Sequence, residues 1–296
     1  MPPRLLRLFR AEWDKLAANR LIAVLFVWIF PLGTLVLSSL AIVIALLSED
    51  YRQQLLLQGI SPWDGALLYT WGIVNSEVGR SVVVVFAAIV FTGEYQFGTW
   101  KQITTRQPRG LLIGVKWLTL IAYVLTAFIT MSLIHAVASG ILASIVGLDF
   151  GTVTAARLND FLLEYMQRLG LGLALVLIAT GYAAIAALIS RTIVIAVGTG
   201  VILIIAEQVS IVFFALLEEL LGINLIWLYR LTPGFNLANL GTWAISDRPL
   251  LPFQGGDLAA GFSPVGWAAS ATIVVIWVAL LTGITSAHFR RQDLTT

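Results

Sequence analysis

Residues 169–217 read LGLGLALVLIATGYAAIAALISRTIVIAVGTGVILIIAEQVSIVFFALL, and this stretch alone is enough to indicate a structural class. Only two of its residues are charged, Arg191 and Glu207. A helix of about 20 apolar residues crosses the hydrocarbon core of a bilayer. The polar triplet Ser190–Thr192 divides the stretch into two runs of that length. We therefore expect two membrane-spanning helices, Leu169–Ile189 and Ile193–Leu217, joined by a tight turn.

The rest of the chain repeats this pattern. Hydrophobic residues occupy 59% and charged residues 11% of its 296 positions, and the mean hydropathy is +0.92; a soluble domain carries about 25% charged residues. Four further apolar runs reach the length of a span: Leu21–Leu47, Leu67–Phe91, Leu111–Val146 and Val265–Ala287. The sequence therefore predicts an all-α polytopic membrane protein, with six transmembrane helices in one domain, residues 21–296. The run at 111–146 exceeds one crossing, so we expect it to tilt or to project from the bilayer.

The first 20 residues form a separate amphipathic segment. Apolar residues recur at three- and four-residue steps from Leu5 to Leu16, whereas Arg4, Arg10 and Lys15 lie largely elsewhere on the helix. This pattern predicts an N-terminal helix, residues 1–20, lying in the membrane interface. A cytoplasmic extension of the first span fits the pattern equally well. In either arrangement, the basic residues favour a cytoplasmic N-terminus.

The segment between the fifth and sixth runs, residues 222–264, is moderately apolar but repeatedly interrupted. It contains Pro233, Pro249, Pro252 and Pro264 and the pair Gly255–Gly256. Proline and glycine break regular helices, so short re-entrant or interfacial helices on the outer side fit better than a seventh span.

Lys and Arg are distributed unequally between the two sides of this topology. Twelve of the eighteen fall on the side of both termini, five fall on the other side, and Arg80 lies inside the second run. Cytoplasmic loops of membrane proteins carry such an excess of positive charge. We therefore expect a multi-pass protein of the cell membrane whose N- and C-termini are cytoplasmic.

The sequence contains no group of residues that supports catalysis. Cysteine is absent, which removes disulfides, thiolate metal sites and cysteine nucleophiles together. The two histidines, His135 and His288, are far apart, so we expect no metal site and no catalytic residue. There is also no Gly-x-x-x-x-Gly-Lys-Ser/Thr phosphate loop. We therefore expect that the chain is not an enzyme and binds no cofactor itself.

Three ionisable residues within the apolar runs are candidates for a functional role, because charges at membrane depth are costly. Glu77 and Arg80 are three residues apart, which puts them on one helical face and predicts a mutual ion pair, with substrate contact as the alternative. Glu207 has no cation near it in the sequence. It must therefore face the bundle interior, a water-filled cavity or a partner, in a functional or a purely structural role.

The connection between the second and third runs is long and polar. Residues 91–116 read FTGEYQFGTWKQITTRQPRGLLIGVK, whereas helix–helix connections commonly take about 2–8 residues. The acidic Glu94 stands at the end of a span. A Gly-Thr step, a short polar helix and a turn at 106–109 are expected to follow it.

This connection resembles that of the permease subunits of the ABC-type-2 exporter superfamily. In those subunits, a pattern like Glu-Tyr-x-x-Gly-Thr, a basic Arg-x-x-Arg stretch and a Lys join the second and third spans. The end of the chain, Phe289–Leu294, is also similar to the end of such permeases. The resemblance covers the length, the span count and both motifs, and residues 222–264 only in general layout. The matching residues of the connection are Glu94, Tyr95, Gly98, Thr99, Arg106, Arg109 and Lys116.

The resemblance implies a coupling helix around Glu94–Thr105, within a coupling segment 93–110 that also includes Lys101. This helix would dock into a separate nucleotide-binding ATPase subunit, which would hold ATP and Mg²⁺. The implied partners are this ATPase, a second permease copy and membrane lipid, without nucleic acid. The basic residues Arg106, Arg109 and Lys116 could also contact lipid phosphates as topology determinants, and the two roles are compatible.

The implied function is export of a substrate across the membrane with ATP hydrolysed by the partner. An ion- or proton-coupled secondary transporter is an alternative, with Glu77, Arg80 and Glu207 as relay groups, although inverted repeats are not evident. A non-transporting membrane anchor or sensor subunit is another, because the same coupling segment would suit it.

Overall fold

The structure is a computed structural model, and it describes residues 3–18, 23, 27–74, 76–96, 99–100, 107–223, 225–251 and 263–292. These residues form helices and no β-strand. The prediction of an all-α polytopic membrane protein is confirmed, because six of the described helices are long and apolar enough to cross a membrane: α3 (Ile29–Leu47), α7 (Glu77–Gln96), α9 (Arg109–Val146), α10 (Ala155–Ser190), α11 (Ile193–Leu221) and α14 (Trp267–Arg291).

Shorter helices occupy the N-terminus and two of the connections. Helix α1 (Pro3–Ala18) comes first, and α4 (Glu49–Gln58), α5 (Trp63–Tyr69) and α6 (Trp71–Val74) lie between α3 and α7. The 3₁₀ helix η2 (Ile226–Leu231) and α12 (Pro233–Ser246) follow α11. Residues 222–264 thus contain two short helices, as their prolines indicated. Residues 224 and 252–262 of this segment lie outside the described residues.

Two of the predicted span boundaries are wrong. The expected span Leu67–Phe91 is divided into α5, α6 and the spanning helix α7, which starts only at Glu77 and continues to Gln96. The hydroxyl of Ser76 accepts the N–H of Gly79 and starts a new helix there. The expected span Leu169–Ile189 begins much earlier, at Ala155, where the hydroxyl of Thr154 accepts the N–H of Arg157. Hydropathy identifies the membrane-spanning part of a helix and does not detect its polar extension.

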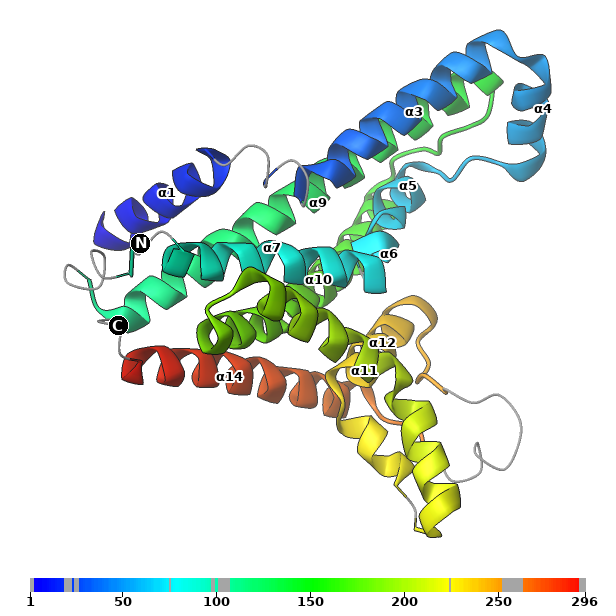
Figure 1. The fold of residues 1–296 in the computed structure, drawn as a ribbon. Helices are drawn as coiled ribbons and strands as arrows, with labels where there is room; N and C mark the ends of the chain where they lie inside the picture. Colours follow the sequence, from blue (N-terminus) through cyan, green and yellow to red (C-terminus); the bar gives the residue numbers. More distant parts are fainter. Residues whose placement is uncertain are drawn as a thin grey trace.

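Both ends of the described chain lie at the same end of the bundle, which we call the inner end (Figure 1). Helix α1 lies beside the first turns of α9 there. Arg4 donates to the side chain of Gln107 at 2.6 Å, and the rings of Trp13 and Tyr123 meet edge to face with centroids 5.1 Å apart. The amphipathic N-terminal helix is therefore packed against the bundle through its aromatic face.

Helix α9 is the longest element, with 38 residues. At 1.5 Å per residue it is about 57 Å long, nearly twice the ~30 Å of the hydrocarbon core. Its second half runs beside α3 toward α4, while α11 and η2 diverge from this pair at the opposite, outer end (Figure 1). The helix therefore extends beyond a single crossing, as its sequence length predicted.

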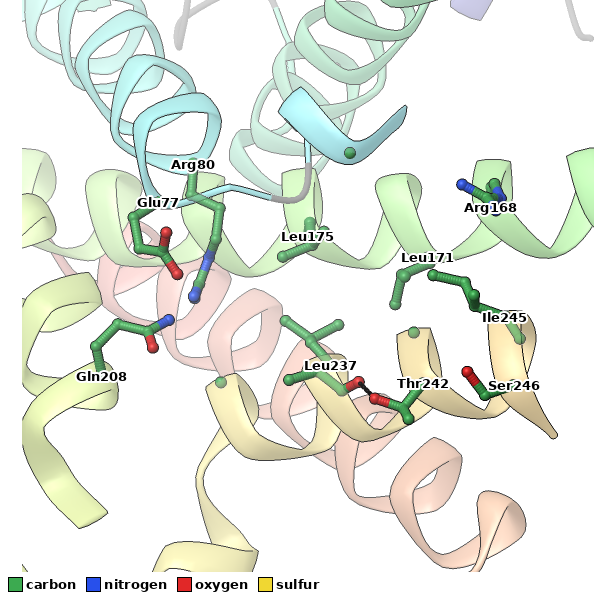
Figure 2. A pocket seen from close by; sticks show the side chains of 15 residues that line it. Glu77, Arg80, Arg168, Leu171, Leu175, Gln208, Leu237, Thr242, Ile245 and Ser246 are labelled. Carbon is green, nitrogen blue, oxygen red and sulfur yellow. Dashed lines mark hydrogen bonds between the residues drawn. The ribbon is translucent and has the colours of Figure 1, made fainter. Parts of the chain in front are cut away.

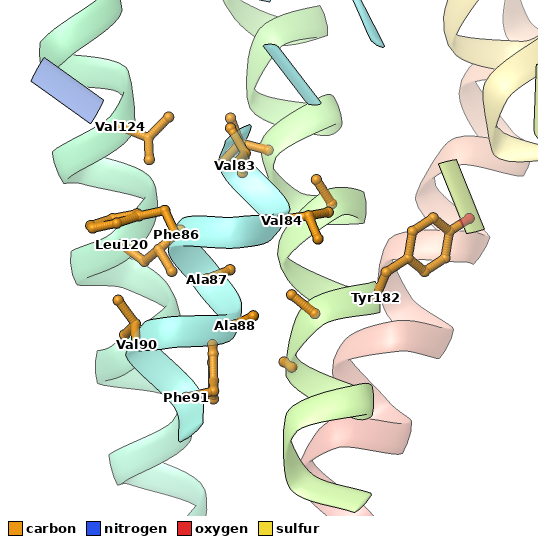
Figure 3. Close-up of a cluster of buried hydrophobic side chains, with 14 of the residues drawn as sticks. Val83, Val84, Phe86, Ala87, Ala88, Val90, Phe91, Leu120, Val124 and Tyr182 are labelled. Carbon is orange, nitrogen blue, oxygen red and sulfur yellow. The ribbon is translucent and has the colours of Figure 1, made fainter. Parts of the chain in front are cut away.

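The core is built around α7, between α9 and α10 (Figure 3). Phe86 and Phe91 of α7 are fully buried together with Leu120 of α9, and Tyr182 of α10 lies on the opposite side of α7. Helices α3 and α11 contribute few buried residues and expose most of their apolar side chains. The described chain therefore has a packed centre and two largely uncovered apolar helices, which lipid or another protein must cover.

Two glycines allow spanning helices to approach closely. A Cβ at Gly200 of α11 would come within 2.5 Å of the side chain of Val84 in α7, and one at Gly181 of α10 within 2.7 Å of Leu281 in α14. Real Cβ atoms essentially never make such contacts, so these crossings require glycine. At Gly198, two residues from Gly200, no atom lies within 4 Å of the equivalent position.

We predict that Gly200→Val lowers the stability of the purified chain, whereas Gly198→Val changes it little. The added methyl groups at 200 meet Val84 of the core, and overpacking of this kind costs about 1–3 kcal/mol. Thermal unfolding in detergent measures the difference, and Gly198→Val controls for the change in helix propensity. Equal destabilisation by the two variants would contradict the close crossing of α7 and α11.

Candidate functional site

The first candidate site is a set of charged residues at the inner end, centred on Glu94 near the end of α7. We call Glu94, Lys15, Lys116, Glu12 and Thr99 the Glu94 cluster. The Glu94 side chain is only 1% exposed, and its carboxylate accepts hydrogen bonds from Lys15, from Thr99 and, at 2.9 Å, from Lys116. A buried carboxylate is tolerated only when it is paired in this way.

Lys116 of α9 is the second centre of this cluster and is 3% exposed. Its ammonium lies 3.3 Å from the Glu12 carboxylate and 3.3 Å from the carbonyl of Val90, and 5.5 Å from the centroid of the Trp100 ring. Two carboxylates and two ammonium groups therefore balance one another. The cluster joins α1, the end of α7, the start of α9 and residues 99–100.

The inner ends of α7, α9, α10 and α14 are joined by a second set of contacts. Arg109 donates to the last carbonyls of the C-terminal helix, those of Phe289, Arg290 and Gln292, at 3.3, 3.0 and 2.6 Å. The side chain of Gln292 accepts from the Tyr95 hydroxyl at 2.5 Å and donates to the carbonyl of Leu188 at 2.9 Å. Cations at a helix C-terminus are stabilising, so Arg109 caps α14.

The structure places the predicted coupling residues in three groups. Glu94 lies inside the protein, and Tyr95 and Arg109 bind the end of α14. Thr99 is half-buried against Glu94. The remaining predicted positions lie outside the described residues: Gly98, Lys101 and Arg106.

Sequence reasoning missed Glu12 as a partner of Lys116, and it also missed Lys15 and Gln292. In the sequence, Lys15 is only one of the charges of the N-terminal helix, and Gln292 is only part of a C-terminal end that is similar to that of the permeases. Nothing in their spacing indicates that they approach the 94–95 region, because the partners are 79 and 197 residues away.

The second candidate site lies between α7, α10 and α11, and we call Arg80, Glu207 and Tyr182 the Arg80 cluster. Arg80 donates to the Glu207 carboxylate through Nη2, and the Tyr182 hydroxyl donates to the other oxygen of Glu207. All three residues are buried. A Cβ at Gly234 would come within 2.8 Å of the Glu207 carboxylate, so α12 also closes on this cluster.

The predicted ion pair between Glu77 and Arg80 is wrong. Arg80 pairs instead with Glu207, which is 127 residues further along the chain. The expectation that Glu207 faces the bundle interior is confirmed. Arg80 pairs with Glu207 because Glu207 is buried and would otherwise be an uncompensated charge. Glu77 is the first residue of α7 and is exposed, so it does not require a paired cation.

A cavity of about 400 Å³ lies next to the Arg80 cluster (Figure 2). Glu77, Arg80 and Gln208 lie toward one end of it, Arg168 lies toward the other, and leucine side chains line the middle. This volume is in the range of small-molecule sites, about 300–1,000 Å³.

A further ion pair joins the short helix α5 to the start of α10. Arg157 donates twice to Asp64, at 2.7 Å for each oxygen. These hydrogen bonds lower the pKa of Asp64 below its usual value. Because the depressed pKa favours the ionised form, this contact is present at neutral pH and is lost only as the pH falls below about 4.

No group of three or more His, Asp or Glu side chains able to hold a metal ion occurs in the described part of the chain. The sequence matches no protein-family model. It has no match among the curated proteins either.

We predict that Arg80→Met and Glu207→Met each destabilise the chain strongly, and that the double variant is less destabilised than either. Removing one partner of a buried pair leaves an uncompensated charge, at a cost of about 3–5 kcal/mol. Removing both charged side chains leaves no uncompensated charge in the protein interior. Thermal unfolding of the four proteins forms a double-mutant cycle.

The exposed pair Glu49–Arg52 on α4 provides the matched control for this cycle. Glu49→Gln should change the unfolding temperature little, because solvent screens such pairs. A strictly additive Arg80–Glu207 cycle would show that the two side chains do not interact.

Proposed function

We propose that this chain is the membrane-spanning permease subunit of an ATP-binding-cassette exporter in the cell membrane. ATP and Mg²⁺ would be held by a separate nucleotide-binding subunit, and two permease copies would form the transport unit. The observation that carries the proposal is the Glu94 cluster. This cluster joins Glu94, the first residue of the Glu-Tyr-x-x-Gly-Thr pattern, to α1 and α9. It lies at the end of the bundle where both ends of the described chain lie.

The order of the elements supports this proposal. An amphipathic N-terminal helix precedes six spans, and α1 packs at the end of the bundle where α7 ends and α9 begins. Two short helices stand between α11 and α14 among the residues that the structure describes. The six spans and the connection between the second and third of them are the part of this layout that the resemblance to ABC-type-2 permeases implies. The excess of Lys and Arg on the side of both termini favours a cytoplasmic position for that side.

The contacts around the connection also suit a mechanical role. Glu94 and Lys116 bind the end of α7 to the start of α9 and, through Lys15, to α1. Arg109 and Tyr95 bind the same region to the end of α14. If a docked ATPase displaced residues 97–107, the displacement would therefore be transmitted to α1, α7, α9 and α14 together, because these contacts connect the four helices.

In this proposal, the residues of the connection divide into two roles. Glu94, Tyr95 and Arg109 transmit the movement within the chain, because their side chains contact other parts of it. Direct contact with the ATPase is assigned to Gly98, Lys101 and Arg106, together with Thr99. The second permease copy would cover part of the exposed apolar surface of α3 and α11.

An ion-coupled secondary transporter is a second candidate, and the Arg80 cluster is the observation that favours it. A carboxylate, a guanidinium and a phenol bonded together between three spanning helices resemble the buried relays of such proteins. Dependence on ATP separates the two candidates: transport by a secondary transporter would follow an ion gradient in the absence of nucleotide.

We predict that reporters inserted after Gln107, after Arg191 and at Thr296 are cytoplasmic, and that one after Arg248 is external. Arg191 occupies the turn between α10 and α11. Arg248 follows α12, a helix that lies away from the inner end of the bundle (Figure 1). Paired alkaline phosphatase and fluorescent-protein fusions measure the side. An external reporter after Gln107 would exclude docking of a cytoplasmic ATPase there.

We predict that two groups of variants fail in different ways. Lys101→Ala/Arg106→Ala should reduce the amount of ATPase that co-purifies with the chain, because a buried polar contact at an interface contributes up to a few kcal/mol. Glu94→Gln/Lys116→Met should retain the ATPase but abolish the influence of the permease on the rate of ATP hydrolysis, because the ion pair that connects α7 to α9 is lost.

Glu49→Gln on α4, an exposed carboxylate at the opposite end of the bundle, is the matched control. The measurements are the mass-spectrometric yield of the co-purified ATPase and its rate in nanodiscs with and without the permease. Wild-type yield and rate in both variants would remove the residue-level support for coupling. If no ATPase co-purifies with the wild-type chain under mild conditions, the exporter proposal fails.

A further inference from the structure

The cavity beside the Arg80 cluster contains a carboxylate that the described part of the chain leaves without an ion pair. Two of the three charged residues that line it are arginines, and each has its own carboxylate: Arg80 binds Glu207, and Arg168 binds Glu164 at 2.5 Å. The third charged residue is Glu77. When each arginine is counted with its partner, the groups around the cavity carry one net negative charge, that of Glu77.

Glu77 lies at a place in the fold that suits a negative charge. It is the first residue of α7, and the partial positive charge of a helix N-terminus stabilises a carboxylate there. Its side chain is exposed rather than inserted among the helices. A charge of this kind, next to apolar helices, favours a cation as its ligand.

The remainder of the cavity fits a ligand that also has an apolar body. Leu171 and Leu175 of α10 and Leu237 of α12 line the middle, between Glu77 and Arg168 (Figure 2). Near Glu77, the exposed side chain of Gln208 also lines the cavity, and its amide oxygen can accept a hydrogen bond. A metal ion fits this cavity poorly, because hard cations take about six or more oxygen ligands. Among the described residues that line the cavity, Glu77 supplies the single carboxylate.

We propose that this cavity binds a small amphiphilic organic cation, with a primary ammonium at Glu77 and an apolar chain along Leu171, Leu175 and Leu237. The ammonium donates to the Glu77 carboxylate and to the Gln208 amide oxygen. Arg80 does not repel it strongly, because Glu207 neutralises that guanidinium. The inference concerns binding alone and requires no ATPase, so its failure would leave the proposed export function untouched.

The test uses the full-length chain in nanodiscs of phosphatidylcholine, a lipid without net charge. Isothermal titration measures binding of hexylammonium, of hexanoate, of hexanol and of sodium ion, with empty nanodiscs subtracted. Hexylammonium should bind most tightly. Glu77→Gln should weaken the binding of hexylammonium roughly tenfold or more, because a charge-assisted hydrogen bond is lost. The same substitution should leave the affinity for hexanol unchanged.

Two further variants complete the design. Glu219→Gln removes an exposed carboxylate at the outer end of α11, outside this cavity, and should have no effect. Ala238→Phe places a large side chain of α12 in the cavity and should weaken the binding of hexylammonium and of hexanol alike. Tighter binding of hexanoate than of hexylammonium, equal binding of sodium and hexylammonium, or unchanged affinity in Glu77→Gln would each overturn the proposal.

Discussion

A charged side chain that lies between apolar helices needs an opposite charge within reach, because no water is present there to solvate it. In this chain the requirement is met between helices that are far apart in the sequence. Glu207 of α11 is paired with Arg80 of α7, and Glu94 of α7 with Lys116 of α9. Each pair therefore connects two spans, in addition to the shape complementarity that places Gly200 against Val84.

The two ends of the bundle satisfy this constraint differently. At the inner end, Glu94, Lys116 and Arg109 join α1, α7, α9 and α14 into one connected set of contacts. At the outer end, the pair α3–α9 diverges from α11 and η2, and a cavity remains beside the Arg80 cluster. A tightly connected inner end and a more open outer end suit a protein in which force is received on one side and a ligand is accommodated toward the other.

The role of Glu94 illustrates how a motif and a structure complement each other. The resemblance to ABC-type-2 permeases drew attention to this residue and implied that its surroundings dock to an ATPase. Its carboxylate is buried and accepts bonds from three side chains of its own chain, so its physical task is internal. In the proposed function, Glu94 would hold the docking segment to the spans without contacting the ATPase itself.

The sequence by itself determined the class of the protein, the number of spans and the helical breaks in 222–264, because these depend on hydropathy, length and proline, which are local properties. It also identified Glu77, Arg80 and Glu207 as unusual, because a charged residue within an apolar run can be recognised from the sequence alone, and Glu94 stands out through the motif that it begins. Only the tertiary structure decided their partners: Glu207, not Glu77, takes Arg80, and Lys15 reaches Glu94. Pairing depends on which helices pack together and how deeply each group is buried, and neither quantity is encoded in the spacing of residues along a single helix.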